Sequence, residues 1–317
     1  ATNWTPAATN QAGSLRLSRG TEIVAAAQAR QEVLVWTDSS LYSLQYVGAG
    51  SGVWAAQLVG EQISIASQNS VAYASGVSYW MGKDKFYMYD GSTQPLQCDL
   101  RKYVFTDFNT EQYNQVFGGS NEAFNEVWWF YCSSSATDND SYVVYNYLEH
   151  IWYYGSMARS AWLDSGLRAF PLAATYNSVL VNHEEGVDDN ETGTTAAIPA
   201  FITSADFDLE DGDRFMLMSR VLPDVSFEGS TAANPAITMS FFPLTSSGSG
   251  YNSPTSESGV STGVATRSAT SPVEVYTSQI HTRVRGRQVS MKIESSAAGV
   301  QWQSGATRID IRPDGRR

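Results

Sequence analysis

The stretch GVSYWMGKDKFYMYD, residues 76–90, carries the pattern that decides the fold: an apolar strand, a tight polar turn and a tyrosine-rich return strand. The same unit recurs three more times within residues 1–190, at intervals of roughly 45 residues. The other copies are EVLVWTDSSLYSLQY at 32–46, EVWWFYCSSSATDNDSYVVYNY at 126–147 and RAFPLAATYNSVLVNHE at 168–184. Units of this size with several short strands are typical of β-propeller blades, which bury their apolar faces against neighbouring blades.

The composition of the whole chain favours an all-β protein. Gly, Ser, Thr, Tyr, Trp and Val are abundant, and no segment carries an apolar stripe of helical period over several turns. The one helix that the sequence predicts is short, Thr106–Val116. No run of 18 apolar residues exists, so we expect no membrane span.

The repeats and the linker GVDDNETGTTAAIPA at 186–200 predict two domains. Residues 1–195 are expected to form propeller blades and residues 196–317 a β-sandwich with a flexible Ser/Gly-rich loop at about 245–271. The expected blades are 21–60, 61–105, 112–158 and 160–195. The expected strands of the sandwich are Phe201–Leu209, Arg214–Val221, Ala236–Phe242, Val273–Ile293 with a break inside, and Val300–Ile311. Four blades are few for a propeller, so we expect either further blades before Ala1 or a ring closed by another subunit.

Charge is distributed unevenly along the chain, whose net charge is −12. The segment Glu184–Asp213 holds ten carboxylates and no Lys or Arg, whereas His281–Arg317 holds eight Arg or Lys against three acids. An acidic body repels the nucleic acid backbone, which argues against DNA binding through most of the surface.

The acidic segment resembles a calcium loop, with Asp206, Asp208, Asp211 and Asp213 as candidate ligands. However, Gly212 stands one place too late for the EF-hand spacing, and Leu217 occupies the position of the bidentate Glu. Solvated turn carboxylates are the alternative interpretation.

Arg283, Arg285 and Arg287 alternate along the chain, so on a strand their guanidinium groups share one face. They form either a binding face for an acidic partner or a solvated sheet face. Because the body is acidic and this end of the chain is basic, we expect the face to lie at a contact between subunits.

The same region contains a conflict of phase. Val284 occupies an even position, opposite the arginines, whereas Val289 and Ile293 are apolar at odd positions. One unbroken strand would bury the arginines on the same face as these apolar residues. Each unpaired guanidinium group would then cost several kcal/mol of stability. We therefore expect the chain to change face between Arg285 and Val289, through a β-bulge or a kink with positive φ at Gly286.

Catalytic signatures are few, and we expect neither an enzyme nor a cofactor. The histidines, His150, His183 and His281, lie in separate units without metal-ligand spacing. Cys98 and Cys132 either pair or, more simply, are free thiols of a protein that matures in a reducing cytoplasm. The alternative function is a secreted propeller that binds or cleaves carbohydrate, since loop carboxylates could supply a catalytic pair.

Several segments resemble one protein family. They are LVWTDSSLYSLQY at 34–46, VSYWMGKDKFYMYDG at 77–91, NEVWWFY at 125–131, YVVYNYLEHIWYYG at 142–155, LVNHEEGVDDN at 180–190, ADFDLEDGDRFMLMSRVLPDV at 205–225, RVRGRQVSMKIES at 283–295 and VQWQSGATRIDIRPDGRR at 300–317. This succession is similar to the structural proteins of short-tailed bacteriophages called tail nozzle, tail tubular protein B or DNA-stabilisation protein.

The resemblance implies a virion structural protein that assembles in the bacterial cytoplasm. It implies a six-fold homo-oligomeric ring below the portal and the tail adaptor protein, forming the distal DNA channel, retaining packaged DNA and supporting tail fibres or spikes. DNA would pass through without specific binding. The family carries no catalytic motif, and its N-terminal blades are not found in this sequence.

Overall fold

The computed structural model describes residues 5, 7, 12–48, 53–210, 212–244 and 268–315. The protein is all-β, 49% strand and 6% helix, with several small antiparallel sheets, which confirms the expected all-β class. The Ser/Gly-rich loop expected at 245–271 falls outside the described residues as far as residue 267. None of the helices in the described ranges is long and apolar enough to cross a membrane.

The chain forms two compact units, Ala1–Glu185 and Gly186–Arg317. The boundary therefore comes earlier than the expected one between residues 195 and 196. The reason is that the linker is structured: β16 (Asp188–Asp189) pairs with β17 (Ala196–Ala197). In addition, the backbone N–H of Gly299 donates to Asp188 Oδ1 at 2.6 Å, so both groups belong to the second unit.

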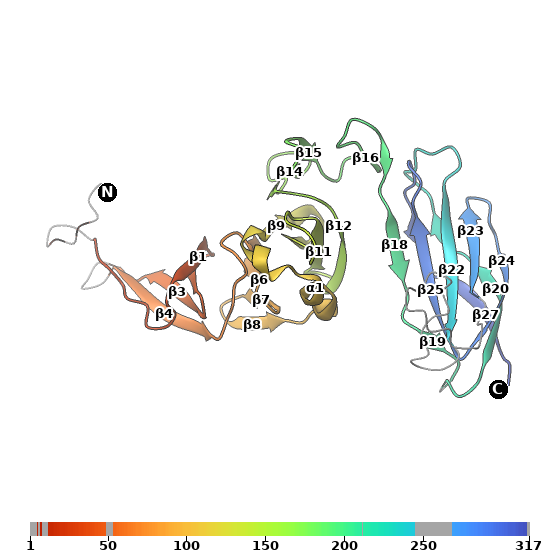
Figure 1. The fold of residues 1–317 in the computed structure, drawn as a ribbon, viewed down its shortest axis with the longest axis horizontal. Helices are drawn as coiled ribbons and strands as arrows, with labels where there is room; N and C mark the ends of the chain where they lie inside the picture. The colour runs from red at the N-terminus through yellow and green to blue at the C-terminus, as the bar shows by residue number, and fades with distance from the viewer. Residues whose placement is uncertain are drawn as a thin grey trace. The chain divides into compact units, whose positions relative to one another are not determined.

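Each sequence repeat forms an antiparallel strand pair in the first unit (Figure 1). The pairs are β2–β3 (Val33–Thr37, Ser40–Tyr46), β6–β7 (Val77–Met81, Phe86–Tyr89), β10–β11 (Glu126–Tyr131, Ser141–Asn146) and β14–β15 (Leu172–Ala174, Leu180–Asn182). The outer strands are β1 (Ile23–Gln28), β4 (Trp54–Glu61), β5 (Val71–Ala74), β8 (Thr93–Leu96), β9 (Phe117–Asn121), β12 (Ile151–Ser156) and β13 (Ala161–Leu163). Strands follow chain order in all four sheets; the first three sheets have four strands and the last has three.

The predicted helix Thr106–Val116 is wrong in its bounds. The structure has an α-helix, α1 (Arg101–Asp107), then a 3₁₀ segment at Thr110–Gln115. Between them Phe108 is extended and bridges to Ser133. The side chain of Asn109 accepts from the Glu111 N–H at 3.0 Å, and this N-cap starts a second helical segment instead of continuing the first.

Buried and partly buried aromatic side chains connect each sheet of the first unit to the next. Trp36 contacts Trp80, with ring centres 5.2 Å apart, and so joins the first sheet to the second. Phe86 contacts Trp129 at 5.0 Å between the second and third sheets. Trp128 stacks on Trp162 at 5.3 Å between the third and fourth sheets. The aromatic residues of the repeats thus fill the spaces between sheets, where burial of each large side chain contributes about 1.5–3 kcal/mol.

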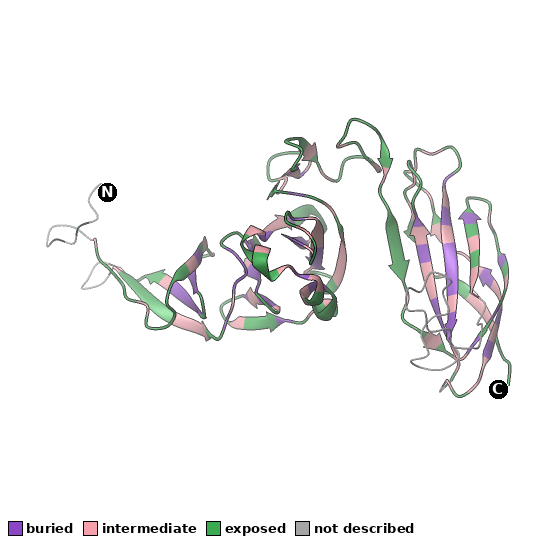
Figure 2. Ribbon diagram, viewed as in Figure 1, coloured by how far each residue is buried: buried purple, intermediate pink, exposed green. Residues whose placement is uncertain are grey.

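The second unit contains two larger sheets that contribute to one core. The first sheet runs β18 (Ala200–Thr203), β25 (Gln288–Ser295), β22 (Ala236–Leu244) and β23 (Ala269–Glu274), with β19 (Phe207–Asp208) also on β25. The other runs β24 (Ile280–Gly286), β20 (Met216–Leu222) and β27 (Arg308–Pro313), and β21 (Val225–Ser226) pairs separately with β26 (Gln303–Ser304). Met218, Met239 and Val289 lie in the shared apolar cluster. Figure 2 shows β22 mostly buried and β18 exposed.

The change of face expected between Arg285 and Val289 is present, but its mechanism differs from the expected bulge. Val284 and Val289 are both buried in the same cluster. The chain leaves one sheet at Gly286, and Arg287, the single residue between β24 and β25, leads it into the other sheet. Gly286 does not adopt a positive φ. Its role is close approach, because an added Cβ would lie 2.9 Å from Pro243 Cβ and 2.8 Å from the Gln288 carbonyl oxygen.

Candidate functional site

The three arginines of the expected interface face have different surroundings. Arg283 and Arg285 are exposed on β24, while Val284 between them is buried. Arg285 lies over the Phe215 ring, 4.2 Å from its centre, and donates to Asp314 Oδ2. Arg287 lies 5.0 Å from the centre of the same ring and donates to the Asp213 carbonyl oxygen at 2.8 Å.

Two guanidinium groups are therefore held by contacts within the chain, and Arg283 is the member of the set whose side chain has no ion pair, ring contact or hydrogen bond among the described residues. It lines a cavity of about 480 Å³ together with residues of β23 and β24. The lining residues are Ser268, Ala269, Thr270, His281, Thr282 and Arg283. A subunit contact at these arginines remains a prediction.

Asp206, Asp208 and Asp213, the calcium candidates that the structure describes, do not form a metal site. Asp208 Oδ2 accepts from Gln288 Nε2 at 3.2 Å, and Asp213 lies 3.9 Å from the guanidinium of Arg214. Asp211 lies outside the described residues, and Asp206 belongs to the segment between β18 and β19. Across the described ranges, no group of three or more His, Cys, Asp or Glu side chains could hold a metal ion.

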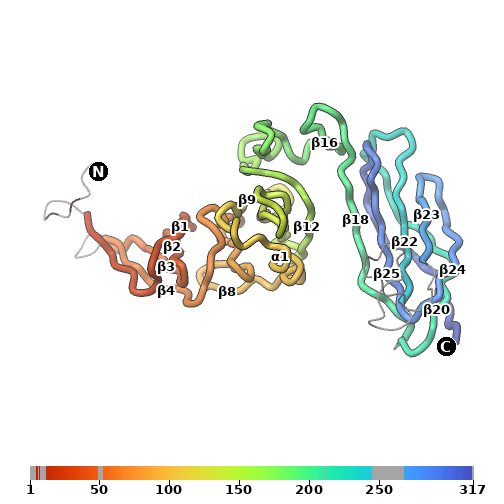
Figure 3. The backbone as a smooth tube through the Cα atoms, viewed as in Figure 1, coloured from red at the N-terminus to blue at the C-terminus, as the bar shows by residue number. Residues whose placement is uncertain are grey.

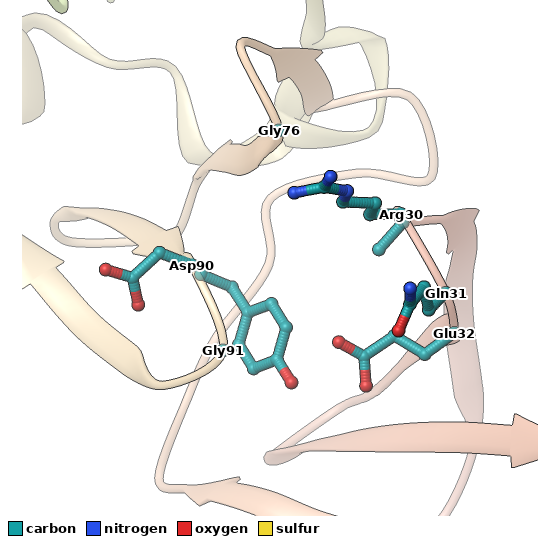
Figure 4. Close-up of a pocket in the computed structure, with 8 residues that line it drawn as sticks. Arg30, Gln31, Glu32, Gly76, Asp90 and Gly91 are labelled. Carbon is teal, nitrogen blue, oxygen red and sulfur yellow. The ribbon is translucent and has the colours of Figure 1, made fainter.

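A polar cavity of about 240 Å³ lies between turns of the first and second sheets (Figure 4). Arg30, Gln31 and Glu32 line one side, and Asp90 and Gly91 lie on the other. Ala29, Gly76 and Tyr89 complete the lining. Because charges of both signs face this space, it suits a small polar group and not a phosphate chain.

The carboxylate of Glu32 is held in place at the edge of this cavity. It accepts hydrogen bonds from Ser43 Oγ and, at 3.2 Å, from Gln45 Nε2. Partial burial alone would raise the pKa of Glu32, but the bonds from Ser43, Gln45 and Tyr89 together lower it. Burial and the charge of Glu32 raise the pKa of Tyr89 to about 12. Glu32 is thus a fixed anion and Tyr89 a neutral donor at ordinary pH.

A second polar cluster joins the third and fourth sheets. Asn121 Nδ2 donates to Glu126 Oε2 at 3.5 Å and to Glu184 Oε1 at 3.3 Å. Trp128 Nε1 donates to Glu126 Oε2 at 3.0 Å. Burial raises the pKa of Glu126 in spite of the bonds it accepts, including one from Tyr153. Partial burial and the charge of Glu126 raise the pKa of Glu184, which lies at the surface end of the cluster.

Neither polar cluster was among the sites predicted from the sequence. Asn121 and Glu184 are 63 residues apart, and no local spacing relates them. The only sequence signal is the acid that begins the buried strand EVWWFY, where an apolar residue would be ordinary.

Cys98 and Cys132, which the sequence left as either a pair or free thiols, are both free. Cys132 is buried, and its Sγ lies 3.3 Å from Asn139 Oδ1. Burial raises the pKa of Cys98 to about 12 and that of Cys132 to about 11. Both thiols are therefore protonated at neutral pH and poorly nucleophilic.

Comparison with known protein families and with curated proteins finds no match to this chain.

Proposed function

We propose that this chain is a virion structural protein, a nozzle-type subunit of a short bacteriophage tail. In this proposal the four small sheets are propeller blades and the two sheets of the second unit form a β-sandwich. The observation that carries the proposal is the succession of sheets in chain order, joined by the aromatic contacts Trp36–Trp80, Phe86–Trp129 and Trp128–Trp162. Sheets that stack in this way bury their faces only on their neighbours, as blades do.

The proposed role is mechanical. Six copies would form a ring beneath the tail adaptor, retain packaged DNA in the channel and hold a fibre or spike protein. The net charge of −12 supports this role, because an acidic wall repels phosphates and lets DNA slide. Assembly would take place in the bacterial cytoplasm, where free cysteines such as Cys98 and Cys132 are ordinary.

Negative-stain electron microscopy of the purified chain tests this function. We expect closed rings of uniform size, together with no release of sugar from polysaccharide substrates. A chain that stays monomeric at all concentrations while it turns over a glycan would contradict the proposal.

One observation favours a second function, carbohydrate cleavage. Glu126 and Glu184 are two carboxylates within reach of the same amide nitrogen, beside the stacked indoles of Trp128 and Trp162. Glycoside hydrolysis uses such a pair, one member being protonated. If this function holds, Glu126→Gln and Glu184→Gln should each abolish glycan turnover and leave the fold intact.

A further inference from the structure

The second unit has two unlike sides, and we infer that they bind each other in successive copies of the chain. The edge strand β18 of one copy would dock against the β23–β24 side of the next. This inference rests on the proposed ring and names the surfaces that would build it.

The first side is an unprotected sheet edge. β18 is the outermost strand of its sheet, and no other strand of the described ranges pairs with its outer edge. Ile198, Phe201 and Ile202 are exposed there by 53%, 50% and 55%. Natural edge strands are usually blunted by Lys, Pro or a charge pointing inward; Pro199 directly precedes the strand AFIT, which itself has none of these. Such an edge is suited to pairing with another strand.

Carboxylates flank this apolar edge. Asp188 and Asp189 of β16 precede β18, and Asp206 and Asp208 follow it. The charged part of a partner that fits this edge is therefore basic.

The opposite side of the same unit supplies that chemistry. β23 is the other outermost strand of the β18 sheet, and it contacts β24, the outermost strand of the second sheet (Figure 3). The cavity of about 480 Å³ lies here, with His281 and Arg283 in its lining. In the turn between the two strands, Val275 and Tyr276 are exposed by 56% and 93%. This side thus combines apolar surface with positive charge.

The arrangement favours a second copy in head-to-tail contact over a two-fold dimer. β18 and β23 lie at opposite ends of one sheet, so a single copy cannot satisfy both sides itself. Pairing β18 with β18 of a second copy would be antiparallel, so the end of β18 followed by Asp206 and Asp208 in one copy would lie beside the end preceded by Asp188 and Asp189 in the other. Both ends are acidic and would repel. Contacts between unlike sides repeat from copy to copy and close into a ring when the rotation permits.

Charge reversal tests the contact in the whole chain. Arg283→Glu and Asp206→Arg should each raise the concentration needed for assembly by at least about tenfold, measured by light scattering after size exclusion. The double variant should assemble as the wild type does. An equal mixture of the two single variants should assemble too, since the carboxylate introduced in one chain then meets the guanidinium introduced in the other. Misfolding of either variant would not be repaired by mixing.

A second variant and a control complete the test. Ile202→Lys places a charge on the edge strand and should leave a folded protein that does not assemble. Arg168→Glu, an equal change of charge at an exposed position of the first unit, should assemble normally. If the wild type forms rings and neither Arg283→Glu nor Ile202→Lys affects them, the inference is overturned and the proposed function stands. A dimer lost in Ile202→Lys but unchanged in Arg283→Glu would show β18–β18 pairing and overturn it too. A wild type that never assembles contradicts both.

Discussion

The indole nitrogen of Trp129 donates a hydrogen bond to the carbonyl oxygen of Ser70, 3.0 Å away. These residues are 59 positions apart: Ser70 directly precedes β5 of the second sheet, and Trp129 lies on β10 of the third. The bond matters because Trp129 is fully buried, where an unsatisfied polar group costs about 1–3 kcal/mol.

We expect Trp129→Phe to lower the free energy of unfolding by about 1–3 kcal/mol. The substitution keeps an aromatic ring near Phe86, 5.0 Å away, but it opens a small cavity and leaves the Ser70 carbonyl oxygen with only the longer bond from the Met81 N–H, at 3.4 Å. Urea denaturation followed by near-ultraviolet circular dichroism measures the change. Trp54→Phe is the control, since Trp54 is 46% exposed on β4 and its change should stay within about 0.5 kcal/mol. Equal losses for the two variants would show that the buried bond has no special role.

Gly286→Ala should destabilise the second unit by about 1–3 kcal/mol, because the added Cβ would meet backbone and proline atoms that cannot move away easily. Gly13→Ala is the matched control: a Cβ at Gly13 has nothing within 4 Å. Thermal melts of both variants provide the comparison. A neutral Gly286→Ala would mean that the passage between the two sheets does not need a close approach.

The raised pKa of Glu126 predicts a specific dependence of stability on pH. A carboxyl whose pKa is higher in the folded state than its ordinary value of 4.5 holds its proton more tightly when folded. Its contribution to stability is therefore complete below 4.5 and is lost as the pH rises through the folded-state value. Glu126→Gln cannot lose a proton, so its stability relative to the wild type should increase as the pH rises above 4.5.

Denaturant titrations at several pH values check this prediction. Glu149→Gln, a change at an exposed turn of the same sheet, should follow the wild-type profile. A constant difference in stability between Glu126→Gln and the wild type across this range would rule out the pH effect.

Phe215→Leu should cost the second unit about 1 kcal/mol through lost cation–π contact with both arginines, in addition to the lost ring area. Arg285→Lys should also destabilise, since lysine lacks the planar group that stacks on the ring while it bonds to Asp314. Arg283→Lys on the same strand is the control and should leave the stability of the single subunit unchanged. Chemical denaturation compares the three variants, and an equal effect of the two lysine substitutions would disprove the proposed role of Phe215.

The amino-acid sequence was sufficient to locate most strands of the first unit. Residues 76–90 form β6 and β7 as their pattern predicts, because alternation of apolar residues and a polar turn act within a few residues. The helix at Thr106–Val116 was misplaced because Asn109 caps a second segment, a local signal that the periodicity alone did not reveal. The phase of the apolar positions, which is also a local signal, predicted the change of face between Val284 and Val289.

Only the tertiary structure decided which strands share a sheet and which polar groups meet. The sequence pattern predicted one strand region with a break at Val273–Ile293. In the structure this region forms three strands, of which β23 and β25 lie in one sheet and β24 in the other. The contacts between Asn121 and Glu184 and between Arg287 and Phe215 likewise depend on strands brought together from distant positions. The alternation of apolar and polar side chains is a property of each strand alone. Which strands pair depends on burial of the whole core, to which residues from distant parts of the chain contribute.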